Sequence, residues 1–112
     1  MDESKYLIHF QIIASAGEAR SRALKALEQA ETGAFEEATK LAAEARDLLC
    51  KAHSMELEML KAEAQGESSE MNIISVHAQD HISMATVMVD NAEREIRLYK
   101  RINILERSMG LL

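Results

Sequence analysis

The chain contains no proline, and its four glycines stand at positions 17, 33, 66 and 110. Proline costs about 3 kcal/mol and glycine about 1 kcal/mol in a helix interior, so a chain without proline can form long helices. The glycines near one third and two thirds of the length are natural positions for breaks. The sequence therefore predicts three helices, over about 4–31, 34–65 and 70–108.

Each predicted helix carries an apolar stripe at helical spacing. The stripe of the first helix consists of Ile12, Ala16, Ala19, Ala23, Ala26 and Ala30. That of the second consists of Ala34, Ala38, Leu41, Ala45, Leu48, Ala52, Met55, Met59 and Ala62. That of the third consists of Ser75, Ala78, Ile82, Ala85, Val89, Ala92, Ile96 and Tyr99. Small side chains in these stripes allow helices to approach closely, and we expect Gly17 to have the same structural role.

The breaks between the helices are short, which is typical of antiparallel neighbours in a bundle. Gly33 fits a left-handed end of the first helix, with Thr32 available to cap the second helix. Ser68 or Ser69 is the expected N-cap of the third helix. The sequence thus predicts an all-α fold, a single domain over residues 1–112 that forms an up-down-up antiparallel three-helix bundle.

The composition excludes several classes of function. The formal net charge is −6 at pH 7, and nucleic-acid binding requires clustered lysine and arginine, so we expect no nucleic-acid partner. The lone cysteine, Cys50, cannot form an internal disulfide. The N-terminus lacks the pattern of a signal peptide, and no stretch reaches the roughly 18 apolar residues that span a bilayer. We therefore expect a cytoplasmic protein that is not inserted in the membrane.

The third predicted helix is apolar on more than one side. From residue 73 to residue 89 its only ionisable side chains are those of His77, Asp80 and His81. A second apolar surface lies beside the stripe and contains Ile73, Val76, Met84, Val87 and Met88. Two other helices cannot cover all of this, so we expect a homo-oligomer assembled through the third helix.

Asp80 lies within this second apolar surface, where an unpaired carboxylate is costly. In a cyclic oligomer its copies would converge on the axis, and like charges brought together need shared protons or a cation. Mg²⁺ held by carboxylate oxygens is one solution, with one ion per oligomer. Pairing of Asp80 with a neighbouring histidine or lysine is the alternative.

His77 and His81 are four residues apart and so share one face of the helix. One interpretation is a zinc site, with His53, His9 or surface carboxylates as further ligands. Another is a structural pair of core histidines. The third is a nucleophilic His77 that is assisted by His81.

The third interpretation has a chemical basis. Neutral imidazole attacks phosphorus, and an apolar wall of Met84 and Met88 would disfavour the imidazolium. Phosphoryl transfer places charge on the equatorial oxygens, which nearby donors stabilise. Protonated His81 and the Gln79 amide are the candidate donors.

The run His77-Ala78-Gln79-Asp80-His81 is the most specific of several segments with a common resemblance. The other segments are 10–13, 16–21, 30–33 with Phe35, 52–53 and 63–66. Together they resemble the lactose/cellobiose-type enzyme IIA of the bacterial sugar phosphotransferase system. The chain departs from the family pattern at Glu56-Leu57 and at Ile82-Ser83.

The resemblance implies a phosphotransferase component that works as a phosphohistidine carrier in sugar uptake. His77 would accept phosphate from the histidine-containing phosphocarrier protein (HPr) and pass it to a cysteine of the cognate enzyme IIB. It also implies a homotrimer with Asp80 around a central metal ion. The alternatives are a helical metal-binding module that uses His77, Asp80 and His81, and a structural or interaction oligomer.

Overall fold

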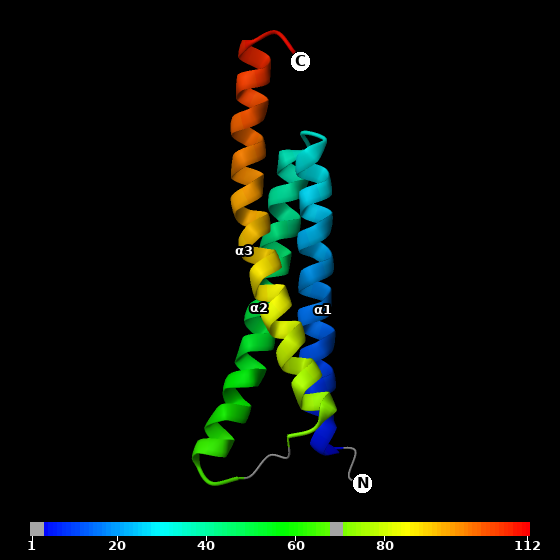
Figure 1. The fold of residues 1–112 in the computed structure, drawn as a ribbon, viewed down its shortest axis with the longest axis vertical. Helices are drawn as coiled ribbons and strands as arrows, with labels where there is room; N and C mark the ends of the chain where they lie inside the picture. The colour runs from blue at the N-terminus through cyan, green and yellow to red at the C-terminus, as the bar shows by residue number, and fades with distance from the viewer. Residues whose placement is uncertain (1–3, 68–70) are drawn as a thin grey trace.

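The computed structural model describes residues 4–67 and 71–112. Within these residues it contains three helices and no strand: α1 (Ser4–Glu31), α2 (Phe35–Ala64) and α3 (Ile73–Ser108). The helices run up, down and up along a rod of 63 × 23 × 19 Å (Figure 1). The predicted all-α three-helix fold is confirmed.

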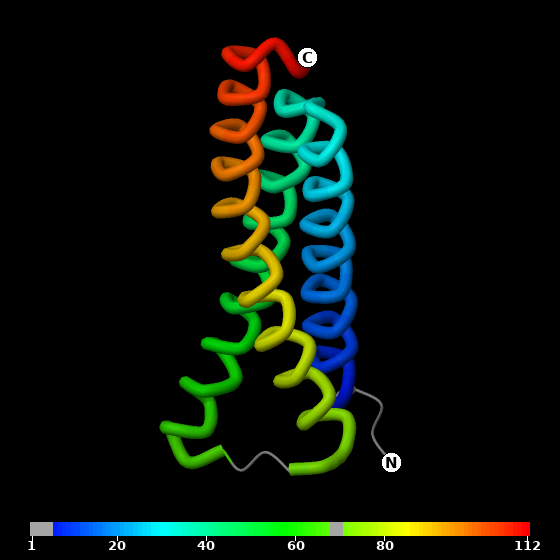
Figure 2. The backbone as a smooth tube through the Cα atoms, turned by 45° about the horizontal axis from the view of Figure 1, so that its top comes forward, coloured from blue at the N-terminus to red at the C-terminus, as the bar shows by residue number. Residues whose placement is uncertain are grey.

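Helix α1 is the central element, because it packs along both other helices while α2 and α3 make fewer contacts with each other. Figure 2 shows why: the second half of α2 and the first half of α3 diverge, and the first half of α3 stays beside α1. The histidine pair lies on this first half of α3, next to α1.

The core is built from the predicted stripes. All six stripe residues of α1 are buried, as are the six stripe residues of α3 from Ala78 to Ile96. Of the predicted α2 stripe only Ala38, Ala45 and Ala52 are buried, the other members are half-buried, and the structure adds Ala42 and Leu49 to the buried set. Most of these side chains are alanine, so the bundle is held by closely packed helices rather than by large apolar side chains.

The first break is a glycine turn. Gly33 has a φ of 83°, a left-handed conformation that glycine adopts without strain, and its amide donates to the Ala30 carbonyl. The Thr32 hydroxyl donates to the Gln29 carbonyl at 2.9 Å, so it closes the end of α1. The prediction that Thr32 caps α2 is wrong, since the N-cap of α2 is Ala34, which has no capping side chain.

The third helix begins later than predicted. Its N-cap is Asn72, whose side-chain oxygen accepts a hydrogen bond from the Ser75 amide at 3.0 Å. The Ser75 hydroxyl in turn accepts from the Asn72 amide at 2.9 Å, which completes a reciprocal capping box. The predicted caps, Ser68 and Ser69, and the predicted start at residue 70 lie outside the described residues. The helix itself starts at Ile73.

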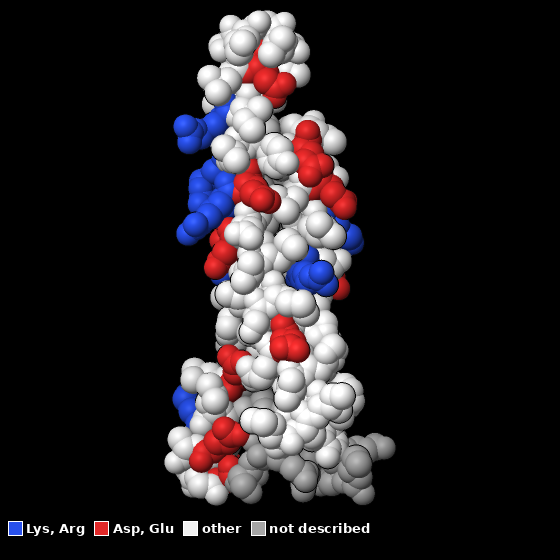
Figure 3. Space-filling view, in the orientation of Figure 1, with Lys and Arg blue, Asp and Glu red and all other residues white. Residues whose placement is uncertain are grey.

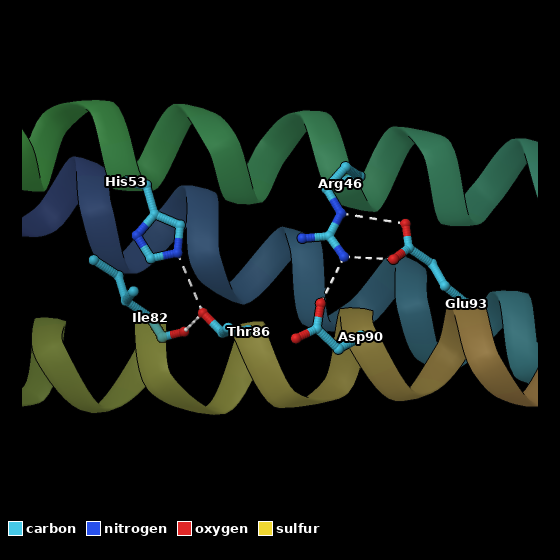
Figure 4. Close-up of polar contacts among 6 residues, drawn as sticks. All are labelled: Arg46, His53, Ile82, Thr86, Asp90 and Glu93. Atoms are coloured by element: carbon cyan, nitrogen blue, oxygen red, sulfur yellow. Dashed lines mark hydrogen bonds and ion pairs between the residues drawn. The ribbon is translucent and has the colours of Figure 1, made fainter.

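A polar link joins α2 to α3 beside the core. The Arg46 guanidinium on α2 contacts Asp90 at 2.6 Å and Glu93 at 2.5 Å, both on α3 (Figure 4). This fork fixes the register between the two helices where they are still close together. None of the helices in the described part of the chain is long and apolar enough to cross a membrane.

Candidate active site: a histidine pair on the third helix

His77 and His81 contact each other on successive turns of α3. Their Nε2 atoms are 3.1 Å apart, and their rings meet edge to face with centroids 4.4 Å apart. Two imidazolium rings would each direct an N–H at the other, so this contact requires that at least one ring be neutral. Of the two rings, that of His77 is exposed and that of His81 is half-buried.

His81 is the more protected member of the pair. Burial, then the charges of His77 and Arg20, lower its pKa below the ordinary histidine value, and Asp80 opposes them. Its Nδ1 atom is buried and has no hydrogen-bond partner among the described residues. The lowered pKa of His81 disfavours the protonated donor expected from the sequence. The neighbouring His77 ring is exposed.

Helix α1 forms the wall behind His81. A Cβ added to Gly17 would lie 3.9 Å from the His81 Nδ1 atom, so the ring packs against α1 at this glycine. Beyond Gly17 a shallow groove separates α1 from α3. It is lined by Arg20, Ser83, Met84, Val87, Met88 and Asn91. Met84 and Met88 of the predicted methionine wall thus line this groove with Arg20 of α1, on the flank of α3 that also carries the pair.

Gln79 lies on the other flank of α3. At about 100° per residue it is roughly 200° from His77 around the helix, and it lines a cleft with His9, Glu56 and Met59. One chain thus brings His81 to His77 but does not bring Gln79 there. Its predicted role as a donor to a phosphoryl group on His77 stays a prediction.

Asp80 is exposed on the outward face of α3, next to exposed Val76 and Val87. The first half of α3 lies in the lower half of Figure 3, and the surface over it carries few charged side chains. No group of three or more histidine, cysteine, aspartate or glutamate side chains within residues 4–67 and 71–112 could hold a metal ion. A magnesium site at Asp80 would therefore need ligands from several copies of the chain.

His53 and His9 lie apart from the pair. The Thr86 hydroxyl donates to the Ile82 carbonyl at 2.7 Å, so it accepts from the His53 Nε2–H at 3.3 Å (Figure 4). Glu56, one of the departures from the family pattern, faces His53 Nδ1 at 3.5 Å rather than His77. His53 thus links α2 to α3, and His9 is buried on α1 beside the cleft of Gln79.

Comparison with known proteins shows which family the chain belongs to. Residues 7–100 match the family described as "PTS system, Lactose/Cellobiose specific IIA subunit". The chain belongs to this enzyme IIA family. It is 42% identical over 102 residues to the lichenan-specific phosphotransferase enzyme IIA component of Bacillus subtilis, covering 91% of this chain and 93% of that protein. It is 38% identical over 99 residues to the lactose-specific EIIA component of Streptococcus mutans, covering 88% and 95%.

Solved enzyme IIA structures share the fold. The cellobiose-specific enzyme IIA of Bacillus anthracis superposes with a TM-score of 0.89 at 35% identity, covering 93% of this chain and 95% of that one. The chitobiose enzyme IIA of Escherichia coli, solved in complex with HPr, gives a TM-score of 0.77 at 25% identity, covering 88% and 96%. This enzyme IIA is a component of a sugar phosphotransferase system.

Sequence reasoning did not single out two residues that border the pair, Gly17 as the neighbour of His81 and Arg20. Both belong to α1, about sixty residues before the histidines, so no local pattern in α3 could have pointed to them. Two signals were present: both residues lie in segment 16–21, which resembles the family, and Arg20 follows Gly17 by three residues, which places it on the same side of α1.

Proposed function

We propose that this enzyme IIA carries a phosphoryl group on His77, which it accepts from HPr and donates to a cysteine of the cognate enzyme IIB. The observation that carries the proposal is the contact between exposed His77 and His81, whose pKa is lowered by burial. An exposed imidazole with a lone pair is the nucleophile that such a transfer requires.

Each phosphoryl transfer breaks one bond to phosphorus as it forms another. A lone pair on His77 attacks phosphorus as the P–N bond to the donor histidine of HPr breaks, and that donor nitrogen keeps the bonding electrons. In the second step a cysteine thiolate of enzyme IIB attacks, the P–S bond forms, and the electrons of the P–N bond return to His77. Both are in-line displacements, so positioning and electrostatic stabilisation supply most of the catalysis.

A solved relative supports the choice of donor. The Escherichia coli chitobiose enzyme IIA, which shares this fold, forms a complex with HPr. The exposure of His77 leaves its ring open to a protein of that kind. We place this relay in the cytoplasm, where the sequence predicts the protein to be.

We further propose that the active assembly is a homotrimer built on α3. Ile73 is 84% exposed and Val87 is 60% exposed in a single chain, and such a surface needs cover from another protein surface. Three copies of Asp80 would then meet at the axis and hold one Mg²⁺. The bound ion would offset the repulsion of the carboxylates.

Phosphorylation is tested by incubating the protein with phosphoenolpyruvate, enzyme I and HPr and recording ³¹P NMR spectra. We expect an acid-labile, base-stable phosphohistidine signal that disappears in His77→Ala and persists in His53→Ala, a histidine that serves as the matched control. Circular dichroism checks that both variants fold. Label that persists on folded His77→Ala contradicts the assignment.

The assembly is tested separately by native mass spectrometry and elemental analysis. We expect a trimer with one ion per three chains, and we expect Asp80→Asn to retain the trimer without the ion. A monomer at micromolar concentration refutes the assembly. One ion per chain would instead favour the metal-binding module.

A further inference from the structure

Arg20 borders the histidine pair from the neighbouring helix. It follows Gly17, the residue that faces the His81 Nδ1 atom, by three residues on α1. It also lines the groove with Met84 and Met88 of α3. These methionines continue the flank of α3 that carries His77 and His81, so Arg20 and the pair open to the same side of the molecule.

The Arg20 guanidinium is uncommitted, in contrast to those of Arg22 and Arg46. Arg22 pairs with Glu18 at 3.2 Å and also with Glu44. Arg46 is held by Asp90 and Glu93. Neither a hydrogen bond nor an ion pair joins Arg20 to any residue within 4–67 and 71–112, although its charge acts on His81.

A phosphoryl group on His77 would create a need for such a cation. It adds about two negative charges near neutral pH, three residues from the Asp80 carboxylate and on a chain whose net charge is already −6. The neutral His81 offers at most one N–H, and Gln79 lies on the other flank of α3. A guanidinium matches phosphate oxygens with two parallel hydrogen bonds and stays charged at every relevant pH.

We propose that Arg20 binds the phosphoryl group on His77 and stabilises it during transfer. This proposal rests on the function proposed above. The group moves between nitrogen and sulfur as already described, and Arg20 neither gains nor loses a proton. It acts as a fixed positive charge that contacts the equatorial oxygens.

The test compares three folded variants, Arg20→Gln, Arg20→Lys and Lys25→Gln. Lys25 is an exposed cation on the same helix, so Lys25→Gln controls for the loss of one positive charge. The first readout is the rate of His77 phosphorylation at saturating HPr. We expect Arg20→Gln to lower this rate by at least about tenfold and Lys25→Gln to match the wild type. The rate of Arg20→Lys should lie between those of Arg20→Gln and the wild type.

The second readout is the ³¹P chemical shift of the purified phosphoprotein, which reports contacts to the phosphoryl oxygens without any partner present. We expect it to move in Arg20→Gln and to stay in Lys25→Gln. An Arg20→Gln protein with the wild-type rate and shift overturns the proposal. The proposal is also overturned if Arg20→Gln raises only the HPr concentration that gives the half-maximal rate and leaves the maximal rate unchanged. That result would mean that Arg20 only helps HPr to bind.

The outcomes separate the two proposals. If the wild type takes up no phosphate, or if His77→Ala keeps it, the proposed function fails. If the wild type is labelled on His77 and Arg20→Gln behaves like Lys25→Gln, the function stands and only the role of Arg20 is refuted.

Discussion

Gly17 on α1 and His81 on α3 face each other across the helix contact, and a Cβ built on Gly17 would lie 3.9 Å from the His81 Nδ1 atom. That separation is an ordinary van der Waals contact, so one methyl group fits without displacing the ring. A longer side chain would extend into the space that the imidazole occupies. The sequence predicts a structural role for Gly17, and the structure shows what lies against it: His81, a histidine of the candidate site.

We therefore expect Gly17→Ala to fold normally and to gain up to about 1 kcal/mol in free energy of unfolding, because alanine is the better helix former. Gly17→Leu should lose about 1–3 kcal/mol through overpacking and should also lower His77 phosphorylation by displacing His81. Urea unfolding and ³¹P labelling measure the two effects. A Gly17→Leu protein with wild-type stability and labelling would show that the ring is not confined by α1.

The lowered pKa of His81 makes stability depend on pH in a definite direction. Burial is the main cause, followed by the charges of His77 and Arg20. In the unfolded chain the pKa returns to the ordinary 6.5, so below that value the unfolded chain binds a proton that the folded chain does not. The contribution of neutral His81 is full above pH 6.5 and is lost as the pH falls toward the folded pKa.

We expect the free energy of unfolding to drop more in the wild type than in His81→Gln between about pH 7.5 and about pH 5.5, which bracket the ordinary histidine pKa. Urea titrations of both proteins at the two pH values give the difference. An NMR titration of the His81 ring should have its midpoint below that of an unfolded control peptide. Equal drops in the two proteins would contradict the burial of His81.

The Arg46 fork should contribute modestly to stability, because its side chain is 35% exposed and water screens such pairs. We expect Arg46→Gln to lower the free energy of unfolding by about 1 kcal/mol or less, with most of the loss disappearing at high salt. Arg97→Gln, which removes an exposed charge from α3, is the matched control. A loss that is unchanged in high salt would mean that Arg46 acts through packing instead.

The alanine core should be intolerant of larger residues. Ala85 is fully buried, so Ala85→Leu must push α3 away from its neighbours, and we expect it to cost about 1–3 kcal/mol. Ala43 is exposed on α2, and Ala43→Leu should leave stability within about 0.5 kcal/mol. Thermal unfolding of the two variants makes the comparison. A harmless Ala85→Leu would show that the interface has spare volume.

The helical spacing of apolar residues predicted most of the fold. It identified the buried stripes of α1 and α3, because apolar residues spaced every three or four positions lie on one face of a helix, and that face packs into the core of a bundle. It could not tell that Phe10 and Leu24 stay 55% and 49% exposed. It wrongly chose Thr32 as the cap of α2, where the N-cap is Ala34, and it did not choose Asn72 as the cap of α3, because several residue types are good N-caps and spacing alone does not select among them.

The sequence predicted only those parts of the candidate site that lie close together in the chain, on one helix. The contact between His77 and His81 follows from their spacing on one helix. The opposite placement of Gln79 follows from the same geometry, and the sequence interpretation overlooked it. Gly17 and Arg20 could not be derived, because the register between α1 and α3 depends on how their alanine stripes interlock.

Helix α3 extends past the turn between α1 and α2 (Figure 1). Beside the turn between α1 and α2 a Cβ on Gly33 would lie 3.7 Å from the Asn103 side chain. Beyond this point Ile104 and Leu105 are exposed. In an isolated chain these last turns can therefore unfold locally while the rest of the bundle stays folded. Their amide hydrogens should exchange with solvent long before those near Val89, which exchange only when the three helices separate.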